Sequence, residues 1–138
     1  MHVRVQVEGT DILALVDTGA TSSFVQQGLV KKLGLWNHVL PCQQHVRYGN
    51  GDTEPMIGVI TLPVRVHGAD MPMRAYVLHS KGPALIMGFT FLEDNKLLVD
   101  CASRTLTMKD GGGQVKCLPV QADSSGSVSQ PADGLPSC

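Results

Sequence analysis

The stretch "ALVDTGATSSFV", residues 14–25, places a carboxylate, that of Asp17, at the end of an apolar run. The run has the composition of a strand inside a sheet. Thr18 and Gly19 follow the acid, and the next residue, Ala20, carries no charge that would neutralise it. An Asp-Thr-Gly tripeptide also fits an ordinary turn, in which Asp bonds a nearby amide and Gly takes a positive φ. A carboxylate at the tip of a buried strand points instead to a functional site.

Length and composition predict one globular domain. The chain has 138 residues, 43% of them hydrophobic, with 11 basic and 12 acidic residues and a formal net charge of −1. No basic run stands out, so we expect no nucleic-acid partner. No apolar stretch approaches the roughly 20 residues that cross a bilayer, and no signal-peptide pattern follows Met1. We therefore expect no membrane partner and a cytoplasmic, reducing location.

The metal-binding residue types show no metal-site spacing. The cysteines lack a Cys-x-x-Cys pair, and we expect most of them to be small buried apolar side chains; they are Cys42, Cys101, Cys117 and Cys138. The five histidines are also scattered, and His67 and His79 are predicted at exposed strand ends. We expect neither a metal nor a cofactor.

Hydrophobic periodicity predicts a mostly β domain over residues 1–120, with one or two short helices. Val3, Val5 and Val7 alternate with polar residues, which is typical of a half-buried strand. Further strands are predicted at 12–16, 57–66, 74–78 and 84–88, with three more within 97–120, and helices at 26–34 and 89–96. Turns are predicted at 8–11 and 67–70.

The sequence also predicts two glycine-rich turns and a C-terminal tail or linker. Gly49-Asn50-Gly51-Asp52 is a strong hairpin signal, because Asn and Gly accept positive φ. Residues 111–113 are three glycines without a following Lys-Ser or Lys-Thr, so they predict a hairpin turn rather than a phosphate site. Residues 121–138 are rich in Ser, Pro, Gly and Asp and predict a disordered tail or linker.

The Asp-Thr-Gly segment and the segments that follow it resemble the retropepsin-like aspartic proteases. The resemblance is strongest to those of long-terminal-repeat retrotransposons and their domesticated cellular relatives. The matching segments occur in the order of that family: 15–25, 29–35, 46–64, 84–92 and the closing strands of 97–120. The resemblance implies an all-β acid-protease barrel that is built as a homodimer, with one half-site per chain.

The resemblance also implies the catalytic residues. Asp17 would be the acid and base, Thr18 would bond across to the partner copy, and Gly19 would let the backbone approach the substrate. Two carboxylates held close together cannot both ionise, so they share a proton and can both activate water and polarise a carbonyl. The chain holds no second Asp-Thr-Gly or Asp-Ser-Gly, so the second carboxylate is expected from another copy.

Further positions would contact a peptide substrate if the resemblance holds. Gly49, Asn50 and Gly51 would form the tip of a flap, and Gly88 would let its strand pass close to the catalytic loop. The full set of predicted substrate contacts is Ala20, Tyr48, Gly49, Asn50, Gly51, Ala84 and Ile86. Core packing is the alternative role for Ala84 and Ile86, and cross-strand packing is the alternative for Tyr48.

The sequence departs from the family pattern at three positions. An Asp and an Arg that form an ion pair in many viral members are replaced by Thr21 and Phe89, and an Asp common in retrotransposon members is replaced by Thr90.

The predicted function is that of an aspartic endopeptidase acting on extended protein segments, with release of itself from a larger precursor as a further expectation. The alternative is a catalytically silent dimeric module that binds proteins with the same fold.

Overall fold

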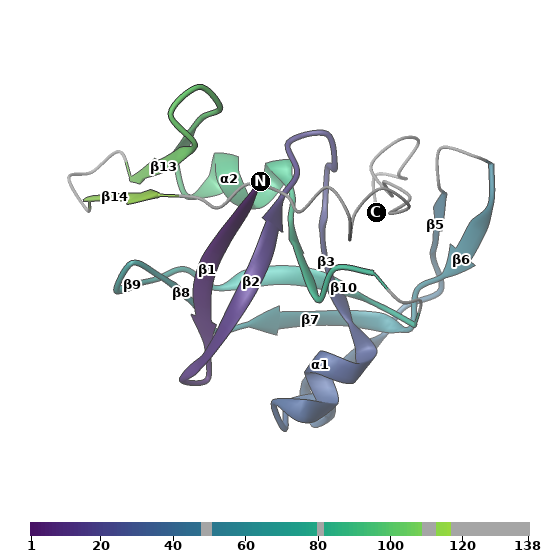
Figure 1. The fold of residues 1–138 in the computed structure, drawn as a ribbon. Helices are drawn as coiled ribbons and strands as arrows, with labels where there is room; N and C mark the ends of the chain where they lie inside the picture. Colours follow the sequence, from purple (N-terminus) through teal and green to yellow (C-terminus); the bar gives the residue numbers. More distant parts are fainter. Residues whose placement is uncertain (48–50, 80–81, 109–112, 117–138) are drawn as a thin grey trace.

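The main body of the protein is one curled β-sheet. The computed structural model describes residues 1–47, 51–79, 82–108 and 113–116. Within these residues nine strands form the sheet, in the spatial order β4 (Leu40–Pro41), β7 (Gly58–Leu62), β10 (Met73–Leu78), β3 (Ser23–Gln26), β11 (Leu85–Met87), β2 (Thr10–Val16), β1 (His2–Val7), β8 (Val64–Val66) and β9 (Ala69–Asp70). Figure 1 shows β1 and β2 running across the direction of β7 and β10, so the sheet curls into a half-barrel.

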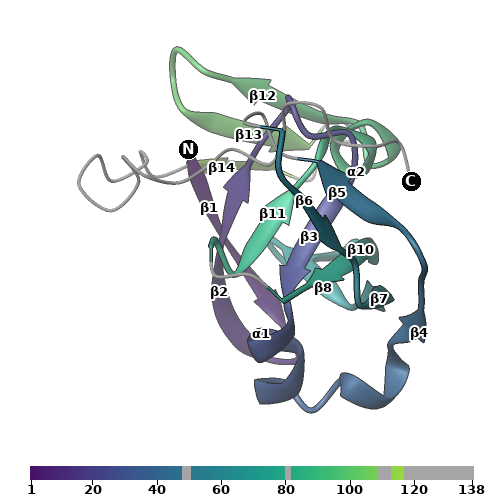
Figure 2. The ribbon, with the colours of Figure 1, turned by 90° about the vertical axis from the view of Figure 1, so that its right-hand side faces the viewer.

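Smaller elements lie at the ends of this half-barrel. Helix α2 (Phe89–Asp94) and a three-stranded sheet of β12 (Leu97–Asp100), β13 (Thr105–Met108) and β14 (Gly113–Lys116) lie at one end, and helix α1 (Gln27–Lys32) lies at the other (Figures 1 and 2). Strands β5 (His45–Arg47) and β6 (Thr53–Pro55) form a separate hairpin, and a short 3₁₀ helix spans Trp36–His38. The predicted class, mostly β with short helices, is confirmed.

The alternation predicted in the first strand is confirmed by its packing. Val3, Val5 and Val7 of β1 are fully buried, and β1 pairs antiparallel with β2. Strand β2 is interior to the sheet, between β1 and β11, as its apolar run predicts. Leu13 is nevertheless 41% exposed, because it lies on the outer face of the pleated sheet at this position.

Buried apolar side chains form two clusters. The larger one fills the inside of the half-barrel and includes the valines of β1. The second, which we call the small apolar cluster, consists of Leu15, Ala20, Phe24, Val46, Met56, Tyr76, Leu78 and Ile86. It joins residues around the Asp-Thr-Gly loop to Val46 of the hairpin strand β5. The loop and the hairpin are therefore connected by apolar packing.

Several predicted boundaries differ from the structure, and two of the differences have a clear local cause. The strand predicted over 57–66 is divided into β7 and β8 at Pro63, because proline lacks the N–H that a central strand donates. The turn predicted over 67–70 is reduced to His67 and Gly68, both with positive φ, and the next two residues form β9. The exposed positions predicted for His67 and His79 are confirmed.

The expectation that most cysteines are buried is wrong for those described. Cys101 is exposed and Cys42 is only partly buried. Cys101 lies in the turn between β12 and β13, which Asp100 closes by accepting hydrogen bonds from the amides of Ala102 (3.0 Å) and Ser103 (3.3 Å). The Ser103 side chain and these amides also lower the pKa of Asp100. Cys117 and Cys138 lie outside the described residues, as does the predicted tail over 121–138.

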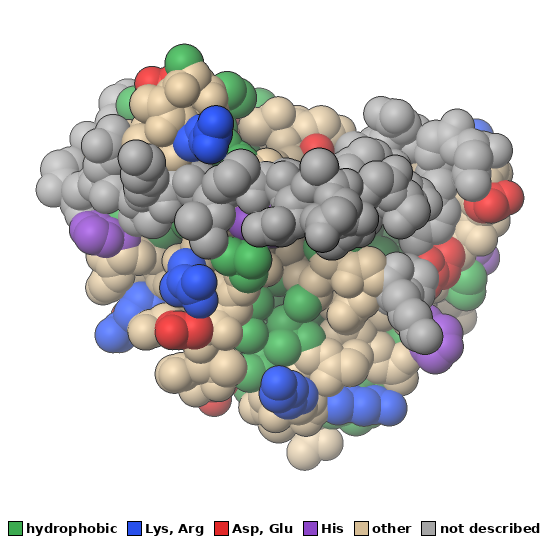
Figure 3. All heavy atoms as spheres, in the orientation of Figure 1, with side chains coloured by type: hydrophobic (Ala, Val, Ile, Leu, Met, Phe, Trp, Pro, Cys, Tyr) green, Lys and Arg blue, Asp and Glu red, His purple; other side chains and the backbone are tan. Residues whose placement is uncertain are grey.

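Charged side chains of both signs occur on the face drawn in Figure 3. Lys and Arg groups and Asp and Glu groups are interspersed around a central area where hydrophobic side chains gather. In the described part of the chain, no helix has the length and hydrophobicity of a membrane span.

Candidate active site

Parallel pairing of β2 with β11 positions the Asp-Thr-Gly loop. Val16, the last residue of β2, is paired with Met87, the last residue of β11. The amide of Asp17 continues this pairing by donating to the carbonyl oxygen of Met87 at 3.0 Å. Parallel strands end at the same edge of a sheet, so Asp17 and Gly88 leave it side by side.

Three further hydrogen bonds attach the loop to the segment after β11. The amide of Phe89 donates to the carbonyl of Ala20 at 2.6 Å, and that of Thr90 donates to the carbonyl of Thr21 at 3.0 Å. The amide of Gly88 donates to the buried Oγ of Ser23, also at 3.0 Å. Residues 17–23 are thus held to residues 87–90 by backbone donors along the whole loop, which fixes the position of the Asp17 carboxylate.

Gly88 has no space for a side chain. A Cβ atom there would overlap with the backbone oxygen of Ser22 and lie 3.0 Å from that of Ala20. Backbone atoms cannot swing aside as a flexible side chain can, so only glycine allows this approach. The expectation that Gly88 lets its strand pass close to the Asp-Thr-Gly loop is confirmed.

The two carboxylate oxygens of Asp17 have different environments. Oδ1 accepts a hydrogen bond from the amide of Gly19 at 3.0 Å. Oδ2 is buried and has no hydrogen-bond partner within the described residues. Thr18 and Gly19 are exposed at the tip of the loop. A buried polar atom without a partner is uncommon in folded proteins, so Oδ2 marks a place where a further donor is expected.

The predicted substrate contacts fall into three groups. Ala20 and Ile86 are buried together in the small apolar cluster, and Ala84 is half-buried just before β11. Gly51 is exposed, with a φ of +94°, beside the hairpin strand β6. The antiparallel pairing of β5 with β6 confirms the predicted hairpin. Tyr48, Gly49 and Asn50 lie outside the described residues.

Backbone contacts occupy the place of the ion pair that many viral members have. Thr21 and Phe89 carry no charge, and the segments that contain them are joined by the amides of Phe89 and Thr90. The Phe89 side chain is 47% exposed. The loop is therefore supported without an ion pair at these two positions.

Two residues that support the site were not predicted. Ser23 binds the amide of Gly88, and the Glu54 carboxylate in β6 accepts a hydrogen bond from the amide of His79 at 3.1 Å. The His79 ring is in turn 2.7 Å from Oε1 of Gln27, at the start of α1. A polar Ser at the start of an apolar strand is the only sequence signal for Ser23. The Glu54 contact spans 25 residues and has none.

A half-barrel that carries Asp-Thr-Gly beside a glycine at the ends of two parallel strands defines an aspartic protease fold of the retropepsin-like class. The chain belongs to the family described as "gag-polyprotein putative aspartyl protease", whose model matches residues 3–94. The resemblance seen in the sequence is confirmed by this match. Within the described residues, no three His, Cys, Asp or Glu side chains gather in a way that could hold a metal ion.

Several curated relatives match most of this chain. It is 24% identical over 115 residues to Protein DNA-DAMAGE INDUCIBLE 1 of Arabidopsis thaliana, covering 83% of this chain and 27% of that protein. It is 25% identical over 108 residues to the Protein DDI1 homolog of Leishmania major, covering 78% and 28% respectively. The chain thus spans about a quarter of the length of these relatives.

Solved structures agree on the fold. The retroviral protease-like domain of Ddi1 from Leishmania major superimposes with a TM-score of 0.70 at 25% identity, covering 86% of this chain and 90% of that domain. EIAV protease in complex with the inhibitor HBY-793 gives a TM-score of 0.54 at 21% identity, covering 68% of this chain and 86% of that one. The second likeness concerns the fold alone.

Proposed function

We propose that residues 1–120 form a homodimeric aspartic endopeptidase that cleaves peptide bonds in extended protein segments. The observation that carries the proposal is the Asp17 carboxylate. It is fixed by the Gly19 amide through Oδ1, and its buried Oδ2 has no partner among the described residues. In the proposed dimer the Asp17 carboxyl group of the second copy would approach this carboxylate, and one proton shared by the two groups would join them by a hydrogen bond.

The chemistry follows from this pairing. The ionised carboxylate of the pair removes a proton from water, and the protonated one donates a hydrogen bond to the scissile carbonyl. The exposed Thr18 is available to bond across the twofold axis. Gly19, also exposed, leaves the backbone open to the substrate. No metal and no covalent nucleophile takes part in this mechanism.

The number of motifs supports a symmetric assembly. Each chain contributes one Asp-Thr-Gly, and a twofold axis through the loop tips brings Asp17 of each copy together. The hairpin of β5 and β6 would cover the peptide, with Gly49, Asn50 and Gly51 at its tip and Tyr48 beside it. Ala20, Ala84 and Ile86 would line the side-chain pockets. Release from a larger precursor is one use of such an activity.

The proposed pair of carboxylates predicts a bell-shaped pH profile of cleavage, with its optimum on the acidic side of neutrality. When both carboxylates are protonated no base is present, and when both are ionised no acid is present, so the rate falls on each side. The measurement is kcat/KM for a fluorogenic peptide over a pH series, with dimer content followed in parallel. A rate that continues to rise into the alkaline range would contradict the shared-proton mechanism.

A further inference from the structure

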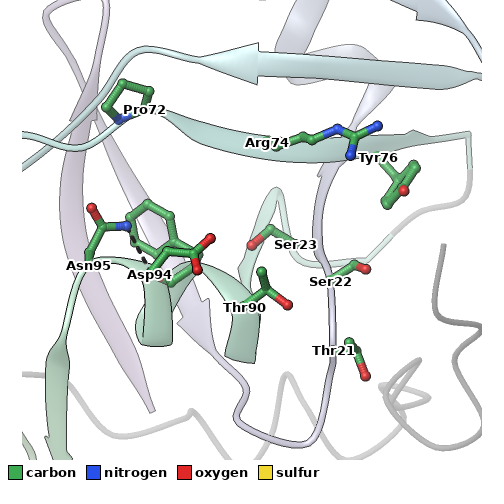
Figure 4. A pocket seen from close by; sticks show the side chains of 10 residues that line it. Thr21, Ser22, Ser23, Pro72, Arg74, Tyr76, Thr90, Asp94 and Asn95 are labelled. Carbon is green, nitrogen blue, oxygen red and sulfur yellow. Dashed lines mark hydrogen bonds between the residues drawn. The ribbon is translucent and has the colours of Figure 1, made fainter.

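A pocket of about 270 Å³ lies beside the Asp-Thr-Gly loop, among three elements (Figure 4). Thr21, Ser22 and Ser23 of the loop line one side, β10 lines the second with Arg74 and Tyr76, and α2 lines the third with Thr90 and Asp94. The volume is close to the lower limit of small-ligand sites, so it suits one or two amino-acid residues.

The pocket carries two opposite charges from different elements. Arg74 stacks over the Tyr76 ring, with its guanidinium carbon 5.8 Å from the ring centroid. Asp94 lies on α2, across the pocket from it (Figure 4). In the described part of the chain, neither side chain forms an ion pair, whereas Arg65 and Asp70 pair at 2.9 Å. Arg74 and Asp94 are both exposed to solvent, so each is accessible to a ligand.

The remaining polar groups suit a peptide. Thr21 and Thr90 are exposed and present hydroxyls that can both donate and accept hydrogen bonds. Their backbones are joined by the 3.0 Å bond from the amide of Thr90 to the carbonyl of Thr21, so this part of the wall is held in place. The stacking of Arg74 on Tyr76 also limits the freedom of the guanidinium, which lowers the entropy lost on binding a carboxylate.

The pocket adjoins the face predicted to bind substrate. Tyr76 lines the pocket and also belongs to the small apolar cluster, together with Ala20 and Ile86. It packs against Phe24, with ring centroids 6.1 Å apart. A peptide that lies along the catalytic loop would therefore pass close to the pocket.

We propose that this pocket binds a dipolar peptide segment, with an acidic side chain at Arg74 and a basic side chain at Asp94. The assignment to the substrate chain rests on the proposed protease function, whereas the binding itself does not require Asp17. Complementary charges chiefly determine which peptide binds and in which direction, because each misplaced like charge is repelled. The site would thus select substrates by one acidic and one basic side chain of the peptide. These two side chains would lie outside the residues that flank the scissile bond.

The test measures binding rather than cleavage. Asp17→Asn protein is titrated into fluorescein-labelled octapeptides that contain one Glu and one Lys at spacings of one to three residues, in both orders, with Gln-substituted peptides as the neutral set. Fluorescence anisotropy reports the affinity at low and high salt. We expect one order of charges to bind about tenfold more tightly than its neutral counterpart, and the difference to shrink at high salt.

Charge reversal in the protein provides the decisive comparison of peptide preferences. Arg74→Glu and Asp94→Lys should each remove the preference, and the double variant should prefer the opposite order of Glu and Lys. Arg4→Glu and Glu93→Lys make the same charge changes at exposed positions that do not line the pocket, and they should change affinity less than twofold. Circular dichroism confirms folding, and Arg74→Gln with Asp94→Asn replaces any variant that fails to fold.

The outcomes separate the two proposals. The pocket assignment would be overturned if peptides bound equally to the pocket and control variants, or if binding showed no preference for charged peptides. This holds even if wild-type protein cleaves peptides. Binding that follows Arg74 and Asp94, in a wild-type protein that cleaves nothing, would retain the pocket and reject the protease.

Discussion

Asp17→Asn is expected to reduce peptide cleavage at least about a thousandfold while leaving the fold and the proposed dimer intact, because the general acid–base catalysis that we propose for the carboxylate pair would be lost. The substitution changes the charge but hardly the volume. The amide oxygen of Asn can still accept the hydrogen bond that the Gly19 amide donates to Oδ1. The measurement is kcat/KM on a fluorogenic peptide library, together with circular dichroism and sedimentation of the same samples.

Asp100→Asn provides a matched control for this prediction. Asp100 also accepts a hydrogen bond at 3.0 Å from the amide two residues later, that of Ala102, but it is the last residue of β12. Both substitutions replace a carboxylate that accepts a hydrogen bond from the amide two residues later, and Asp100 accepts a second one from the amide of Ser103 at 3.3 Å. Because Asp100 lies outside the proposed site, Asp100→Asn should retain full activity. Cleavage that survives in Asp17→Asn would reject the protease assignment. Inactive wild-type protein that still forms dimers would instead favour a protein-binding module.

Gly88→Ala is expected to lower the free energy of unfolding by about 3 kcal/mol and to abolish cleavage. The added Cβ overlaps with the backbone oxygen of Ser22, so β11 and the Asp-Thr-Gly loop must separate. This separation would lengthen the hydrogen bonds of Gly88 to Ser23 and of Phe89 to Ala20. Urea denaturation followed by circular dichroism measures the stability.

Gly28→Ala is the control for the glycine prediction. Gly28 lies in α1, and a Cβ there would meet nothing within 4 Å. Alanine is favoured over glycine in a helix by about 1 kcal/mol, so this variant should be as stable as wild type or slightly more so. Equal stability of Gly88→Ala and wild type would mean that the close contact between the two segments is not required by the fold.

Local patterns were sufficient to predict most of the fold. Alternation of the valines in β1 and the helical spacing in α1 act within a few residues, and both elements are present. The strands on either side of the turn predicted at 49–52 are present as β5 and β6, whereas residues 48–50 lie outside the described residues. The position of Asp17 at the end of a buried strand was likewise visible in the sequence, because the strand and the acid are adjacent.

Features that depend on distant contacts were not predictable. Ser23 accepts a hydrogen bond from the amide of Gly88, 65 residues away, and Glu54 accepts one from the amide of His79, 25 residues away. Neither contact therefore has a local sequence signature. Arg74 and Asp94 line one pocket only because β10 and α2 both lie next to the residues that follow Asp-Thr-Gly. The exposure of Cys101 also depends on the turn that contains it rather than on the apolar character of a thiol.

Mixing of wild-type and Asp17→Asn chains tests the central claim, a site shared by two copies, most directly. Wild-type protein at constant concentration is mixed with an equal amount of the variant and left to exchange subunits, and the cleavage rate is then measured. If both Asp17 residues are required, only about a quarter of the dimers are active, so the rate should fall to about half of that of wild type alone. An equal amount of added Asp100→Asn chain should not lower the rate. An undiminished rate in the Asp17→Asn mixture, with mixed dimers demonstrated by sedimentation of a tagged subunit, would show that one chain carries a complete site and would contradict the account.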